Sequence, residues 1–292
     1  MIKRMIALAA IALLAGQQAE AAPLWDTMKS YFSKRTDERP EIRIMIVKEK
    51  PSVQMAIDGK YRIYDPRTRD HIATRQLGRK AEVTHQGDGL RWSEGFPGLH
   101  QLMIVPDTIT TTIKVDGKEY QGSITIYEVE GMLSVINNIG FEELLTAVLA
   151  DEVGENEPLE LIAAAAIVAR TNAYALAENP ANPFWAVSAD QVGYRGLPPN
   201  TDLTKVHEAV RNTRYMILGA KGSFEGVSTP FSGDFARSQE AKLLNAGKVP
   251  SRISFADAKK LAANGKDAAE ILHHSFPDAE ISMTRYSPGS GR

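Results

Sequence analysis

The sequence predicts an α+β fold, in which an antiparallel, β-rich N-terminal part precedes a core of strands with buried helices. Residues 42–64 alternate apolar and polar side chains with a period of two, as half-buried strands do. After Asn137 the period becomes helical, and residues 161–169 are apolar on all sides, which is typical of a helix inside a core. Because strands come first and helices follow, we expect the two kinds of element to be segregated along the chain.

The N-terminus predicts export. Residues 1–21 have a basic start, an unbroken apolar run from Met5 to Leu14 and a small-residue exit, which together are typical of a secretory signal. The run is about half of the roughly twenty apolar residues that a bilayer span needs, so we expect no stable membrane span after cleavage. We expect the mature chain to be secreted across the inner membrane into the periplasm or cell envelope, with residues 22–41 as a short helical linker.

The composition excludes several classes of protein. The chain has no cysteine, so it forms neither a disulfide nor a thiolate metal site. Its formal net charge is -2 and it has no basic run, which removes any reason to expect a nucleic-acid partner. The roughly 270 residues left after export can bury a core as one large or two small domains.

Eight segments with period-two alternation predict the strands. Asp58-Gly59 lies between the second and third, as a tight hairpin requires, and Asp116-Gly117 and Glu130-Gly131 mark later turns. We expect residues 42–115 to form a β-rich N-terminal segment and residues 116–292 to form the core domain. The expected strands are residues 41–47, 52–57, 60–64, 80–85, 100–105, 110–115, 120–129 and 132–137.

Helices are expected after the last of these strands. Residues 141–153 carry two acids in their first turn, where carboxylates interact favourably with the helix dipole. Residues 158–178 begin with a proline, which suits the first turn of a helix. Further helices are expected at 201–213, 254–264 and 266–274, with short strands around 215–218 and with Gly265 separating the last two helices.

The motifs of common exported hydrolases are missing from the sequence. It has no G-x-S-x-G elbow, no cysteine nucleophile and no H-E-x-x-H helix. The six histidines, at 71, 85, 100, 207, 273 and 274, include no pair at helical ligand spacing, so each is expected to be a surface or core residue. We therefore expect no metal site and no cofactor, which leaves carboxylate chemistry.

Glu152 is the candidate catalytic residue. It ends an apolar helix, after Val148 and Leu149, and Val153-Gly154 follow it. Burial disfavours the charged form of a carboxyl, so we expect a raised pKa, which suits a general acid at neutral pH. The other nearby acids are expected to be structural or solvated: Glu142, Glu143, Glu155, Glu157 and Glu160.

Arg170 lies on the apolar helix and needs an anion nearby, because an unpaired buried guanidinium is strongly destabilising. A pair with Glu152 would hold that carboxyl ionised, so we favour another acid, a backbone carbonyl or a ligand as its partner. A structural ion pair, for example with Asp151, is the alternative.

A loop of polar and aromatic residues follows the second helix. Residues of this kind bind sugar rings by stacking and hydrogen bonding, although the aromatics Phe184 and Trp185 can equally belong to a local core. The candidate substrate-binding residues are Arg170, Asp190, Gln191 and Tyr194.

These residues resemble the SpoIID/LytB family, the stage II sporulation protein D type of murein-degrading domain. The similarity extends over roughly residues 116–218 and again over 261–281. The matching positions are Gly117, Tyr120 and Gly122, the Val-Ile-Asn at 135–137, Glu142, Glu152, Glu160, Ala169-Arg170-Thr171 with Ala173 and Tyr174, Asp190-Gln191, and Tyr194 to Gly196.

The resemblance implies a lytic transglycosylase that acts on peptidoglycan glycan strands, with a preference for strands without stem peptides. Glu152 falls on the family's catalytic glutamate and Arg170 on its active-site-associated arginine. The chain departs from the family pattern at Ala163 and Ala165, where lysine and glutamine are customary, and at 249–260, which replace a glycine- and histidine-rich stretch.

Three functions follow from this comparison of residues. In the first, Glu152 protonates the glycosidic oxygen and later accepts the proton of the sugar's 6-hydroxyl, so that one carboxyl suffices. In the second, the departures make the chain a noncatalytic module that binds glycan or stimulates a cell-wall amidase as a partner. In the third, it is an envelope scaffold that binds no glycan.

Overall fold

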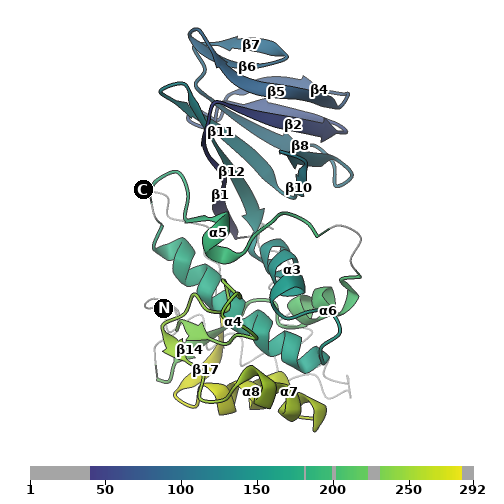
Figure 1. Ribbon diagram of the computed structural model, residues 1–292, viewed down its shortest axis with the longest axis vertical. Helices are drawn as coiled ribbons and strands as arrows, with labels where there is room; N and C mark the ends of the chain where they lie inside the picture. Colours follow the sequence, from purple (N-terminus) through teal and green to yellow (C-terminus); the bar gives the residue numbers. More distant parts are fainter. Residues whose placement is uncertain (1–39, 181, 199–201, 223–230, 285–292) are drawn as a thin grey trace, which may run out of the picture. The chain divides into compact units, whose positions relative to one another are not determined.

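The computed structural model describes residues 40–180, 182–198, 202–222 and 231–284 (Figure 1). The predicted signal at 1–21 and the predicted linker up to residue 39 lie outside the described residues. Antiparallel sheets followed by helices confirm the α+β class.

The strands form two main sheets. All neighbours within them are antiparallel except the β13–β1 pair, which is parallel. In order, the seven-stranded sheet contains β13 (Val187–Ser188), β1 (Glu41–Lys50), β12 (Met132–Gly140), β11 (Ser123–Val129), β8 (Gln101–Pro106), β3 (Tyr61–Tyr64) and β4 (His71–Arg75). The six-stranded sheet contains β10 (Lys118–Tyr120), β9 (Thr112–Val115), β2 (Ser52–Asp58), β5 (Arg79–Gln86), β6 (Gly89–Trp92) and β7 (Glu94–Pro97).

The two sheets share one apolar core. Tyr61 of β3 and Trp92 of β6 belong to different sheets, yet both are fully buried and their ring centroids lie 5.6 Å apart. Alternate residues of β2 and β8 point into the same core, for example Val53 and Ile104. The period of two therefore reflects burial of one face of each sheet.

Two strand predictions were wrong in their pairing. Asp58-Gly59 does not close a hairpin, because β2 has β5 and β9 on its two edges, so β3 pairs with β4 and β8 in the other sheet. The expected strand at 120–129 is two strands in different sheets, separated at Gly122. Gly122 has a φ of 79°, and a Cβ there would collide with the carbonyl of Asn138.

The expected division at 115/116 falls inside a hairpin. β9 and β10 are hydrogen-bonded on its two sides, and Asp116 and Gly117 both have positive φ, as the tight turn requires. β11 and β12, from the segment after residue 116, pair with β8 and β1 from the segment before it. The strands on both sides of the expected division thus complete the same sheets.

The helices of the described chain all follow β12. α3 (Phe141–Glu152) follows β12 directly, and α4 (Leu159–Glu178) packs against α3, α6, α7, α8 and β14. The alanine-rich stretch at 161–169 is buried on all sides, as predicted. The other elements are α5 (Ala189–Val192), α6 (Thr204–Asn212), β14 (Met216–Ala220), β15 (Gly233–Asp234), β16 (Val249–Pro250), α7 (Phe255–Ala263), α8 (Ala268–Ser275) and β17 (Ala279–Met283).

Among the described residues, α4 is the one helix long and apolar enough to cross a membrane by length and composition, but 72% of its apolar window is buried inside the protein. That burial is the arrangement of a core helix.

Candidate active site

Glu152 is the last residue of α3, and its side chain is held inside the fold. The apolar face of α3, including Leu145 and Leu149, is fully buried and draws the end of the helix into the core. Gly154 has a φ of 97°, and its N–H donates to the carbonyl of Leu149, so the chain turns away immediately after Glu152. The glutamate is left 8% exposed.

The Glu152 carboxyl accepts three hydrogen bonds from consecutive backbone N–H groups. The Lys242 and Leu243 N–H groups donate to Oε1 at 2.5 and 2.8 Å, and the Leu244 N–H donates to Oε2 at 3.0 Å. Burial raises the pKa of Glu152 above its usual value, and the three N–H groups oppose that shift by stabilising the ionised form. Since burial is the larger effect, the predicted direction of the pKa shift is confirmed.

The loop at 190–194 lies beside the same carboxyl. β13 pairs with β1 and sets the position of α5, after which Gly193 takes a left-handed conformation with φ 65°. A Cβ on Gly193 would come within 3.1 Å of Glu152 Oε1. Only a residue without a side chain fits against the carboxyl without crowding it.

Asp190 and Gln191 are both exposed on α5. The Gln191 side-chain oxygen accepts the Ser188 N–H at 2.8 Å, and the Gln191 N–H donates to Ser188 Oγ at 3.3 Å, which forms a capping box. The oxygen of Gln191 is thus used in the helix cap.

Tyr194 lies in the core. Its hydroxyl donates to Asn137 Oδ1 at 2.8 Å, and its ring packs edge-on against Tyr120 at 5.8 Å. Burial raises the pKa of the Tyr194 hydroxyl. Asn137, in turn, donates to the carbonyls of Gln121 and Ser123, so these residues fasten the 190–194 loop to β12 and β11.

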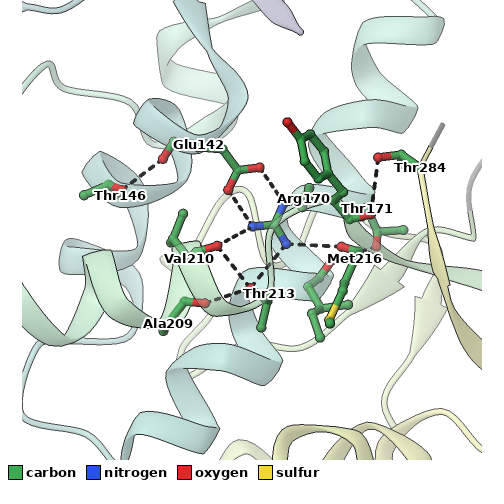
Figure 2. Close-up of polar contacts among 11 residues, drawn as sticks. Glu142, Thr146, Arg170, Thr171, Ala209, Val210, Thr213, Met216 and Thr284 are labelled. Atoms are coloured by element: carbon green, nitrogen blue, oxygen red, sulfur yellow. Dashed lines mark hydrogen bonds and ion pairs between the residues drawn. The ribbon is translucent and has the colours of Figure 1, made fainter. Parts of the chain in front are cut away.

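Arg170 is completely buried, and its hydrogen bonds are shown in Figure 2. Its Nε and Nη2 donate to the two oxygens of Glu142 at 2.9 and 2.7 Å. Nη1 donates to Thr213 Oγ1 at 3.4 Å and to the Met216 carbonyl at 3.1 Å, and Nη2 also donates to the Val210 carbonyl at 3.1 Å. All five N–H donors of the guanidinium are used within the protein.

Arg170 was expected to bind another acid, a backbone carbonyl or a ligand rather than Glu152, and it binds an acid and backbone carbonyls. The acid is Glu142 and not Asp151. Glu142 is structural, as expected, but sequence reasoning did not identify it as the counter-ion. The need of Arg170 for an anion was the signal that could have led to it.

The two residues after Arg170 also fasten distant segments to α4. Thr171 Oγ1 accepts the N–H of Leu218 in β14 at 2.9 Å. The Asn172 amide donates to the carbonyls of Gly233 and Leu243 at 2.7 and 2.9 Å. Asn172 thus binds the carbonyl of Leu243, whose N–H is bound by Glu152.

The departures from the family pattern lie partly on α4 and partly in the segment 249–260. Ala163 and Ala165, on α4, are buried in the hydrophobic core, so apolar packing replaces the polar groups customary there. Residues 249–260 form β16 and most of α7. Arg237, in the segment before them, donates to the Val153 carbonyl at 3.2 Å, next to Glu152 in the chain.

The fold and the site together define an α+β protein with a buried carboxyl, that of Glu152, beside a polar loop. A family model described as Stage II sporulation protein matches residues 129–219. An uncharacterized protein of Chlamydia pneumoniae is 30% identical over 256 residues, which are 86% of this chain and 85% of the relative. An uncharacterized protein of Chlamydia muridarum is 26% identical over 83% of this chain and 77% of its own length. An uncharacterized protein of Brachyspira hyodysenteriae is 27% identical over 65% of this chain and 51% of its own length.

The chain belongs to the SpoIID family, the stage II sporulation proteins. Membership of this family supports a cell-wall related role.

Proposed function

We propose that the protein is a peptidoglycan lytic transglycosylase in which Glu152 is the single general acid and base. The observation that carries this proposal is the Glu152 carboxyl, at the end of α3. It is buried, has a raised pKa and lies beside Gly193. The substrate class is the glycan strand, with a preference for strands without stem peptides.

In the proposed reaction, protonated Glu152 gives its proton to the glycosidic oxygen. The bond between that oxygen and C1 of the muramic acid breaks as an oxocarbenium-like centre forms. The 6-hydroxyl of the same sugar then attacks C1, and its proton passes to the Glu152 carboxylate. The products are a free hydroxyl on the leaving sugar and a 1,6-anhydromuramic end, and Glu152 is protonated again.

The backbone around Glu152 suits this role. A carboxyl group offers about four lone-pair positions, and the N–H groups of residues 242–244 use three of them. The remaining position is on Oε2, which can carry the proton that is transferred. The three N–H groups also fix the orientation of the carboxyl, and orientation is a large part of what general acid catalysis requires.

The experiment is an assay of Glu152→Gln on amidase-treated glycan strands. We expect the wild-type protein to produce anhydromuramic ends, detected by mass spectrometry, and the variant to lose at least about 100-fold in rate. Glu280→Gln, at an exposed glutamate on β17, is the matched control and keeps full activity.

Glutamine cannot accept the Leu244 N–H through its amide nitrogen, so Glu152→Gln also needs a test of folding. Circular dichroism and strand-binding measurements supply it. Anhydromuramic products that persist in a folded Glu152→Gln protein would rule out this role for Glu152.

A second function is favoured by a specific observation. The Glu152 carboxyl is only 8% exposed and already accepts three backbone hydrogen bonds, an arrangement that also suits a purely structural glutamate. In that case the protein is a noncatalytic glycan-binding or amidase-stimulating module. Strand binding by the wild-type protein with no anhydromuramic product decides for this alternative.

We also propose that the mature protein acts in the periplasm or cell envelope without a lasting membrane span, and that its partners there are glycan strands and a cell-wall amidase. The apolar N-terminal run and the family membership support this location. Fractionation of cells that produce a tagged full-length chain tests it, since a cytoplasmic mature protein would contradict the proposal.

A further inference from the structure

Two histidines and a glutamate converge where the two sheets meet. His85 lies on β5 of the six-stranded sheet, His100 directly precedes β8, and Glu128 lies on β11 of the seven-stranded sheet. The Glu128 N–H donates to the His100 carbonyl at 2.8 Å, which fixes the backbones of these two residues relative to each other. The three side chains come from positions up to 43 residues apart and from both sheets.

The ligand atoms of these three residues all lie within 4.8 Å of one another. Nδ1 of His100 lies 2.5 Å from Glu128 Oε2, and Nδ1 of His85 lies 3.5 Å from Glu128 Oε1. The two imidazole rings are stacked, with centroids 6.5 Å apart and an angle of 24° between their planes. Both rings thus face the same carboxylate.

His85 Nδ1 is buried and has no hydrogen-bond partner among the described residues. A buried polar atom without a partner is destabilising, and a cation bound to its lone pair would remove that cost. The Glu128 side chain is only 5% exposed, so its charge also lies out of water. The Gly131 N–H, which donates to Glu128 Oε1 at 2.6 Å, fixes the orientation of this carboxylate.

We propose that His85, His100 and Glu128 bind a zinc ion that links the two sheets, with the fourth coordination position open to solvent. Two imidazoles and one carboxylate are a ligand set that zinc accepts, and they disfavour magnesium and calcium, which prefer oxygen ligands. The His100 side chain is 53% exposed, which leaves one side of the cluster accessible to water.

The spacing of the side chains is compatible with this ion. Zinc bonds of about 2.0–2.2 Å in tetrahedral geometry separate the ligand atoms by roughly 3.3–3.6 Å. The distance between His85 Nδ1 and Glu128 Oε1 already has this value. The pair of His100 and Glu128 is closer, so zinc would replace their hydrogen bond after a small rotation of the exposed His100 ring.

The test uses the untagged mature protein, residues 22–292. Its metal is removed with a chelator, and it is then titrated with zinc sulfate by calorimetry. We expect about one zinc per chain, measured independently by elemental analysis after gel filtration, and a higher melting temperature with zinc than without it. Loss of a residue that only hydrogen-bonds to a metal ligand weakens metal binding by about 10- to 100-fold. His85→Ala removes one of the proposed ligands themselves, so it should weaken zinc binding by at least about tenfold.

His85→Ala leaves the hydrogen bond between His100 and Glu128 in place, so the variant is expected to fold. His71→Ala, at an exposed histidine on β4, is the matched control and should bind zinc like the wild type. The proposal is overturned if the wild type binds no stoichiometric zinc, or if His71→Ala and His85→Ala lose binding equally. Neither result bears on the proposed role of Glu152, which needs no metal.

Discussion

Glu152 and Arg170 are both buried ionisable residues, but their hydrogen-bonding capacity is used differently. All five N–H donors of Arg170 bind groups of the protein itself, so none remains for a glycan. Glu152 accepts three N–H groups and keeps one lone-pair position. At the scale of single residues, Arg170 therefore organises the fold around the site, and Glu152 is the group able to exchange a proton.

Replacing Arg170 with methionine is expected to reduce the free energy of unfolding by about 3 kcal/mol or more, because it leaves Glu142 and several carbonyls without their donor. Urea denaturation measures this loss. Arg252→Met is the matched control, since its ion pair with Asp278 is largely exposed and should contribute less than about 1 kcal/mol. A stable Arg170→Met protein that fails to bind glycan would instead make Arg170 a substrate-binding residue.

The raised pKa of Glu152 predicts the pH dependence of activity. A general acid works only while it is protonated, so activity is present below the pKa of Glu152 in the folded protein and is lost as the pH rises through it. Because burial raises that pKa from the usual 4.5, the loss should occur at a higher pH than an exposed glutamate would give.

The charge of Asp151 also contributes to this raised pKa. Asp151→Asn should therefore move the loss of activity to lower pH without abolishing activity, as measured by rates across a pH series. A profile that Asp151→Asn leaves unchanged would separate the activity from the ionisation of Glu152.

At the scale of elements, α4 is the part that holds the others together. Three consecutive residues of α4 do this. Arg170 binds α3 and α6, and Thr171 binds β14. Asn172 binds the segment around 233–244. The last of these segments supplies the N–H groups that orient Glu152. The geometry of the site therefore depends on how closely this segment packs.

Gly247→Ala tests that dependence. A Cβ on Gly247 would collide with the backbone of Gly233, where no flexible side chain can give way. We expect the substitution to reduce stability by about 2–3 kcal/mol, as overpacking does, and to increase amide hydrogen exchange in residues 242–244. Gly95→Ala is the matched control, because no atom lies within 4 Å of its added Cβ. Equal effects of the two substitutions would contradict a special role for this contact.

At the scale of the whole molecule, periodicity predicted the longer strands and helices, because burial of one face determines it, but it missed the short strands β4, β6 and β7. It located α3 and α4 within about two residues, a normal uncertainty for helix ends. It did not predict strand partners, as at Asp58-Gly59, because a turn signal describes local backbone and not which edges of a strand are already paired.

The site was predictable in part, because the pattern of apolar residues also indicates which ionisable residues are buried. The burial of Glu152 follows from the pattern of its own helix, and so does the direction of its pKa shift. Its partners lie 90 to 92 residues further along the chain and are backbone groups, which no side-chain pattern reveals. The cluster of His85, His100 and Glu128 was missed because sheet pairing, and not helical spacing, brings it together.

β12 passes into α3 without an intervening loop, since Gly140 ends the strand and Phe141 begins the helix. A recombination event that exchanged residues 42–115 alone would divide the hairpin of β9 and β10, and β12 and β11 would lose β1 and β8, their hydrogen-bond partners. The two parts should therefore be inherited as one block. The similarity to the Chlamydia pneumoniae protein agrees with this history, because its 256 matched residues are more than residues 116–292 contain, whereas the family model matches only 129–219.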